Sequence, residues 1–139
     1  MKEDSLKVFC DGGARGNPGP AACAFVVYLR EKIIFKQAFF LGKATNNIAE
    51  YSAVINALSW IKKNPDVVGD SHIHFFLDSE LVVRQLSMVY KVKNENLKKL
   101  FVETKTIEGL LKNKIIYNHV YRSKNAVADE LLNLELDLH

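Results

Sequence analysis

The order of its apolar segments limits most strongly how this chain can fold. Three segments with strand-like apolar patterns follow one another before the first helical pattern appears: 6–11, 21–29 and 33–41. Helical and strand-like patterns then alternate, with helices from 46 to 61, 79 to 89, 96 to 111 and 127 to 138, and strands at 72–77 and 115–120. This order predicts one α/β domain over residues 1–139, in which an antiparallel three-strand meander adjoins a parallel part.

Local signals define the ends of several predicted helices. Asn46 or Asn47 is expected to start the first helix, and Asn64 with the following proline ends it. Ser79 is expected to cap the second helix. The last helix is predicted from apolar residues at spacings of i, i+4, i+7 and i+11, namely Val127, Leu131, Leu134 and Leu138.

Three acidic residues lie at the end of a predicted strand or in the segment that follows it. Asp11 and Asp78 each end an apolar strand, and ligand sites of α/β sheets form at that edge. An acid after a strand is also a common turn residue, so neither position is decisive alone. Asp129 follows the last strand, in the first turn of the final helix, where the helix dipole by itself favours an acid.

Glu50 is a more informative acid because it lies on the apolar stripe of its helix, in line with Val54 and Ile61. Glutamate is rarely buried unless it is paired or bound to a metal. The alternative is that Glu50 only interacts with the dipole at the start of its helix. Taken together, the pattern predicts that Asp11, Asp78 and Asp129 converge at one sheet edge and that Glu50 reaches in from the first helix.

A cluster of four carboxylates needs protonation or bound cations, because like charges at close range repel strongly in a low dielectric. Oxygen ligands at neutral pH favour Mg²⁺ or Mn²⁺. Two such ions can activate water and stabilise the leaving oxygen of a phosphodiester. The sequence offers no Cys and His set suited to zinc, and Cys10 and Cys23 lie in apolar or small-residue stretches that predict buried free thiols.

Charge and hydropathy restrict the partners and the location. The net charge of +3 permits a polyanionic partner without requiring one, and the lysines between 91 and 114 can also be read as a solvated helix face. The polar start does not fit a secretory signal, and no apolar run reaches the roughly 18 residues of a membrane span. We therefore expect a cytoplasmic protein without a membrane partner.

Four segments carry a resemblance to a known family: FCDGGARGNPG (9–19), TNNIAEY (45–51), LDSELV (77–82), and HV with NAVADEL (119–120 and 125–131). With these segments the chain resembles type 1 ribonuclease H, an endonuclease that cuts the RNA strand of RNA–DNA hybrids. The resemblance implies a ribonuclease H-like fold: a five-stranded mixed sheet of order 3-2-1-4-5, with strands 1–3 antiparallel and helices on both faces. It also implies hydrolysis with two Mg²⁺ or Mn²⁺ ions per site when substrate is bound, leaving 5′-phosphate and 3′-hydroxyl ends.

The resemblance assigns roles to individual residues. It implies that the catalytic metal ligands are Asp11, Glu50, Asp78 and Asp129. His119 matches a loop histidine that assists proton transfer or product release, and its alternative role is a polar residue at a strand end. Contacts with RNA 2′-hydroxyl groups, by which a protein separates RNA from DNA, are implied for Gly12, Asn17 and Asn46. A DNA phosphate is implied to lie against Lys43, Thr45 and Asn125.

One departure from the family is visible after the second helix. Many bacterial members carry a basic, tryptophan-containing protrusion there, whereas here residues 88–96 are short and Trp60 lies elsewhere. The chain thus resembles a compact branch without the protrusion, so we expect affinity to depend on Lys43 and the lysines from Lys91 to Lys105. Some relatives cut double-stranded RNA, so double-stranded RNA is an alternative substrate for this chain. We expect a monomer.

Three other functions are alternatives to this one. A dinucleotide-binding loop does not fit, because Gly13, Gly16 and Gly19 are three residues apart and a strand rather than a helix follows them. A catalytically silent nucleic-acid-binding module has no need for an acidic cluster that faces a polyanion. A different nuclease with the same fold is disfavoured by the Asp-Gly-Gly and Thr-Asn-Asn segments, since the fold alone does not separate such enzymes.

Overall fold

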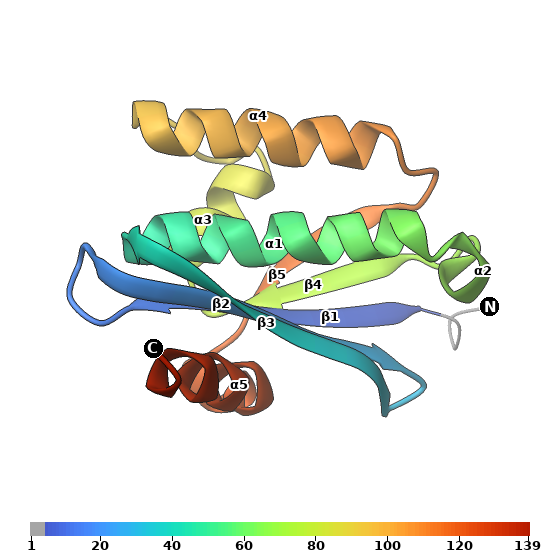
Figure 1. The fold of residues 1–139 in the computed structure, drawn as a ribbon. Helices are drawn as coiled ribbons and strands as arrows, with labels where there is room; N and C mark the ends of the chain where they lie inside the picture. Colours follow the sequence, from blue (N-terminus) through green and yellow to red (C-terminus); the bar gives the residue numbers. More distant parts are fainter. Residues whose placement is uncertain (1–4) are drawn as a thin grey trace.

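The structure is a computed structural model and describes residues 5–139; the polar start, residues 1–4, lies outside this range. In the described part, one five-stranded sheet consists of β1 (Leu6–Ala14), β2 (Gly19–Leu29), β3 (Lys32–Ala44), β4 (Ile73–Leu77) and β5 (Ile115–His119). The strand order is β3-β2-β1-β4-β5 (Figure 1). β1, β2 and β3 pair antiparallel, whereas β4 pairs parallel with both β1 and β5. The predicted sheet order and strand directions are confirmed.

Helices cover both faces of the sheet, as expected (Figure 1). Their bounds are α1 (Asn46–Lys63), α2 (Pro65–Val68), α3 (Glu80–Leu86), α4 (Glu95–Gly109) and α5 (Ala126–Asp137), and a short 3₁₀ helix (Arg122–Lys124) precedes α5. The main core fills the space between α1 and one sheet face, where Leu6, Val8 and Phe75 are buried. α5 lies against the opposite face, on which a smaller apolar cluster forms. α2 was not predicted, although Pro65 is favourable at a first helical position.

β1 is longer than predicted, because it does not end at Asp11. It continues to Ala14 since its antiparallel pairing with β2 extends from Leu6 to Ala14, with Asp11 opposite Ala24. The parallel pairing with β4 stops earlier, at Cys10 opposite Leu77. Asp11 therefore lies inside a strand but just past the point where the neighbouring strand ends. Gly12 and Gly13 are accommodated within the strand, and the expected turn lies after Ala14, between β1 and β2.

Three helix ends refine the predictions. α1 begins at Asn46, one of the two predicted starts, but Thr45 supplies the cap by accepting a hydrogen bond from the Ile48 N–H at 3.2 Å. Ser79 is confirmed as the cap of α3, since its hydroxyl accepts from the Val82 N–H at 3.3 Å. α3 ends at Leu86 instead of near residue 89, because Met88 adopts a left-handed backbone conformation with φ of 68°.

The predicted last helix is confirmed as α5, but the apolar residues that indicated it are not its buried face. Val127, Leu134 and Leu138 are 38%, 57% and 77% exposed. The buried side chains of α5 are instead Ala128, Leu132 and Leu136, and the two leucines pack against Ala22 and Ala24 of β2. Both sets have helical spacing, and the small alanines on the sheet decide the orientation because they leave room for the second set.

Two other expectations concern the cysteines and the membrane. Cys10 and Cys23 are buried free thiols, which confirms the prediction. No helix among residues 5–139 combines the length and the apolar character that crossing a bilayer requires.

Candidate active site

Three carboxylates from separate elements meet at one point. Asp11 comes from β1, Glu50 from α1 and Asp78 directly after β4, and an oxygen of each lies within 4.8 Å of an oxygen of the others. Asp11 and Glu50 are buried, with 4% and 5% of their surface exposed. The register explains the meeting of the two aspartates, because Cys10 is paired with Leu77 and each aspartate is the next residue along its chain.

Gly12 brings the helix that carries Glu50 against β1. A Cβ atom on Gly12 would lie 2.2 Å from the carbonyl carbon of Ala49 and 2.4 Å from the backbone nitrogen of Glu50. Only a glycine permits this approach of two backbones. The Gly12 N–H also donates a hydrogen bond to Asp11 Oδ1 at 3.0 Å. Gly12 thereby allows Glu50 to reach the cluster and orients the carboxylate of Asp11.

Asp129 joins the same cavity from the opposite face of the sheet. It lies in the first turn of α5, as predicted, and lines a cavity of about 480 Å³ together with the other three acids. It is outside the tight group of three carboxylates, yet its charge and a side-chain hydrogen bond act on Asp11. The structure therefore brings all four predicted acids to one cavity.

Burial and mutual repulsion make this cluster unfavourable in its fully charged form. Burial, followed by the charges of Asp78 and Asp129, raises the pKa of Asp11 to about 8. Burial, followed by the charges of Asp11 and Asp78, raises the pKa of Glu50 well above its usual range. Glu50 Oε1 is buried and has no hydrogen-bond partner among residues 5–139. An unpartnered buried carboxylate oxygen within an all-oxygen cluster fits a hard divalent cation.

The raised pKa values predict how the stability of the metal-free protein depends on pH. Between 3.8 and about 8 the folded state retains a proton on Asp11 that the unfolded chain releases. The free energy of unfolding must then fall as pH rises through this window. One pKa unit corresponds to about 1.4 kcal/mol, so we expect a total decrease of at least about 2 kcal/mol. Urea unfolding in chelator across this range measures the slope. Asp11→Asn should flatten it, and an equal slope in this variant would contradict the assignment.

Asn125 lies beneath the cluster and is 1% exposed. Its side-chain amide donates to the Cys10 carbonyl oxygen at 2.8 Å and to Asp78 Oδ2 at 3.3 Å. These bonds fix the chain just before α5 to β1 and orient Asp78. A contact between this amide and a DNA phosphate, as predicted, would require both bonds to be exchanged.

Two other predicted substrate residues form a connected pair beside the cavity. Asn17 Oδ1 accepts a hydrogen bond from the Asn46 N–H at 2.9 Å, and Asn46 Oδ1 accepts one from the Ala14 N–H at 2.8 Å. The loop between β1 and β2 is thus attached to the start of α1, and Asn46 also lines the cavity. Lys43 is exposed near the end of β3, and the Thr45 hydroxyl is used as the helix cap.

Two arginines border the cavity beside the acids, whereas the predicted catalytic histidine lies outside it. His119 is the exposed last residue of β5, paired with Leu77, and it does not line the cavity. Arg122 and Arg15 do line it, and the charge of Arg122 lowers the pKa of Glu50. Arg15 also pairs with Asp137 at 2.6 Å. Both arginines were missed from the sequence, where the only signal was a basic residue near a predicted acid.

The sheet order, the helices on both faces and the carboxylates beyond the ends of paired strands define a ribonuclease H-like protein. The family model of RNase H matches residues 3–136. The chain belongs to the RNase H family.

Individual relatives agree with this assignment. The chain is 37% identical to the bifunctional protein Rv2228c of Mycobacterium tuberculosis over 91% of its own length, and 35% identical to ribonuclease HI of Halobacterium salinarum over 95%. It spans about a third (34%) of the first protein and 64% of the second. The crystal structure of LC11-RNase H1, isolated from compost, has a TM-score of 0.92 and 38% identity, and the match covers 96% of both chains. The same protein in complex with an RNA/DNA hybrid has a TM-score of 0.91.

Proposed function

We propose that this protein is an endoribonuclease that hydrolyses the RNA strand of RNA–DNA hybrids. The observation that carries the proposal is the group of Asp11, Glu50 and Asp78, whose carboxylate oxygens lie within 4.8 Å of one another although two of the residues are buried. Such a group is costly for folding, which favours a functional role. The similarity to LC11-RNase H1 supports the choice of substrate.

The four carboxylates at the cavity, with Asp129 as the fourth, are proposed to hold two Mg²⁺ or Mn²⁺ ions when substrate is bound. Such ions supply the activation of a water molecule and the stabilisation of the leaving oxygen of a phosphodiester. Asn125 keeps Asp78 oriented through its hydrogen bond. His119, at the exposed end of β5, is proposed to transfer a proton or to assist product release. The expected products carry 5′-phosphate and 3′-hydroxyl ends.

Substrate contacts are proposed for residues around the cavity. Gly12, Asn17 and Asn46 are proposed to contact RNA 2′-hydroxyl groups, and the position of Asn46 on the cavity wall supports this. Lys43, Thr45 and Asn125 are proposed to hold a DNA phosphate, for Asn125 after its present hydrogen bonds are exchanged. Action as a monomer in the cytoplasm stays a prediction.

A cleavage assay on four matched duplexes tests the function. The duplexes are RNA–DNA, RNA–RNA, DNA–DNA, and DNA with one embedded ribonucleotide, each with Mg²⁺, with Mn²⁺ or with chelator. We expect the RNA–DNA hybrid to be cut only when a divalent ion is present. Equal cutting of RNA–RNA would indicate the broader specificity, and binding without any cutting would indicate a silent module. Cleavage that persists in chelator would refute the metal requirement.

A further inference from the structure

An apolar groove lies on the side of the sheet that carries α1 and α4, between residues 88–92 and α4. It has a volume of about 400 Å³ and the following apolar lining: Met88, Val89, Tyr90, Val92, Phe101 and Val102. Met88, Val89 and Val102 are 70%, 61% and 56% exposed. The volume is within the range of about 300–1,000 Å³ found for ligand pockets. Exposed apolar side chains gathered in one place indicate a binding surface more often than isolated ones do.

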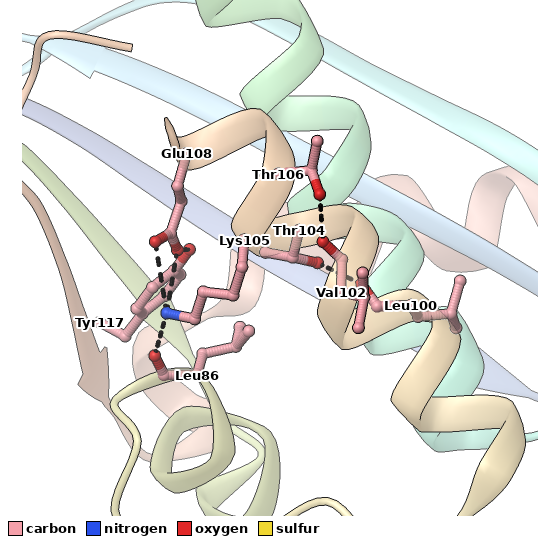
Figure 2. A network of polar contacts seen from close by, with 8 residues as sticks. All are labelled: Leu86, Leu100, Val102, Thr104, Lys105, Thr106, Glu108 and Tyr117. Atoms are coloured by element: carbon pink, nitrogen blue, oxygen red, sulfur yellow. Dashed lines mark hydrogen bonds and ion pairs between the residues drawn. The ribbon is translucent and has the colours of Figure 1, made fainter. Parts of the chain in front are cut away.

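The two walls of this groove are fixed to each other by a polar network (Figure 2). Lys105 Nζ on α4 donates to the Leu86 carbonyl oxygen at 2.6 Å, at the end of α3, and pairs with Glu108 at 3.3 Å. The Tyr117 hydroxyl of β5 donates to the same Glu108 carboxylate. The network therefore joins α4 to the end of α3 and to the sheet.

The loop wall is itself held in one conformation. Met88 is left-handed, and the N–H groups of Val89 and Tyr90 both donate to the Arg84 carbonyl oxygen, at 2.8 and 3.1 Å. Glycine is the usual residue at such a position after a helix, because a side chain there is strained. The Met88 side chain is nevertheless exposed at this position. A groove that is already formed binds at a lower cost in ordering.

The charge of the groove has one sign. Lys91 and Lys98 belong to its lining and no acidic residue does. Outside the lining, the same segments carry exposed Lys93 and Lys99 as well as exposed Glu95 and Glu103. Lys105, which we expected to contact substrate, is instead engaged in the network with Glu108. An apolar centre with a cationic rim is complementary to a ligand with apolar anchors and negative charge.

We propose that this groove binds an acidic peptide segment of a partner protein through its apolar side chains. A nucleic acid is less suited, because bases stack on open aromatic faces. The Arg84 guanidinium covers the Tyr90 ring at 5.6 Å, and the Lys105 ammonium lies over the Phe101 ring at 5.7 Å. The rest of the apolar lining is aliphatic. The proposal concerns recruitment and does not depend on the proposed cleavage.

Two synthetic peptides test the proposal. They have equal length and equal acidic content, one with Leu and Phe anchors and the other with Ser at those positions, and their binding to the whole protein is followed by fluorescence anisotropy. Val102→Glu should weaken binding of the anchored peptide by about tenfold or more, as loss of a buried anchor contact does. Lys98→Glu should weaken it by about threefold or more and reduce its salt dependence.

Matched controls separate the groove from general effects. Leu134→Glu makes the same kind of change on an exposed leucine of α5, across the sheet, and should leave binding unchanged. Val102→Ala keeps the helix and should weaken binding to a smaller extent, and thermal unfolding verifies that each variant is folded. Equal binding of the Ser peptide would overturn the proposal. So would a Val102→Glu variant that keeps the peptide but loses affinity for RNA–DNA hybrid in chelator.

Discussion

Asp11→Asn is expected to reduce cleavage of RNA–DNA hybrid by about a thousandfold or more, while it makes the metal-free protein more stable at pH 8. The loss follows from removing one proposed oxygen ligand and one negative charge from the cluster, and a thousandfold corresponds to roughly 4 kcal/mol of transition-state stabilisation. The gain in stability follows because the pKa of Asp11 is raised to about 8, so its ionisation opposes folding. A residue needed only for structure would change activity and stability in the same direction.

Cleavage rates with saturating Mg²⁺, and urea unfolding in chelator, measure the two effects in the same preparation. Asp78→Asn should lose activity in the same way, since Asp78 belongs to the same oxygen cluster. Asp66→Asn is the matched control, because Asp66 is an exposed acid in the first turn of α2. Near-normal activity of Asp11→Asn, or a loss of its metal-free stability, would show that Asp11 is not a ligand.

Gly12→Ala is expected to destabilise the protein by about 3 kcal/mol or more and to remove most of its activity. The added methyl group would lie 2.2 Å from the carbonyl carbon of Ala49 and 2.3 Å from its oxygen. These are backbone atoms of α1 and cannot rotate away, so the helix must shift from β1, and overpacking of this kind costs about 1–3 kcal/mol even where side chains can adjust. Glu50 moves with the helix and leaves the other carboxylates.

Thermal and urea unfolding measure the destabilisation. Gly109→Ala is the matched control, because a methyl group there meets no atom within 4 Å and lies at the end of α4. This control should be neutral or slightly stabilising, as alanine is the better helix former. If Gly12→Ala were as stable as the wild type and equally active, the close approach of β1 and α1 would not determine the site.

Much of the fold was predictable because apolar periodicity is a local property. The alternating pattern of β1 and the buried position of Glu50 both follow from spacing alone, and both are confirmed. The extension of β1 beyond Asp11 was not predictable in this way, because the pairing with β2 overrides the turn tendency of the glycines. The buried face of α5 was not predictable for a similar reason, since spacing identifies two stripes and only the alanines of β2 select one.

The acids of the candidate site could be predicted from the sequence, whereas the residues that support them could not. Carboxylates in apolar contexts are visible in a sequence, whereas Asn125 acts through the Cys10 carbonyl oxygen and Asp78, both distant along the chain. Arg122 and Arg15 face the cavity only after α5 and the first hairpin are packed. The groove beside α4 likewise depends on the contact of Lys105 with the Leu86 carbonyl oxygen.

The four acids come from β1, α1, the end of β4 and α5, so they span nearly the whole length of the chain. During synthesis the ribosome releases Asp11 and Glu50 well before Asp129. A nascent chain therefore lacks the fourth carboxylate until α5 has emerged and packed on the far side of the sheet. The cavity with all four carboxylates is therefore complete only when nearly the whole chain has been translated.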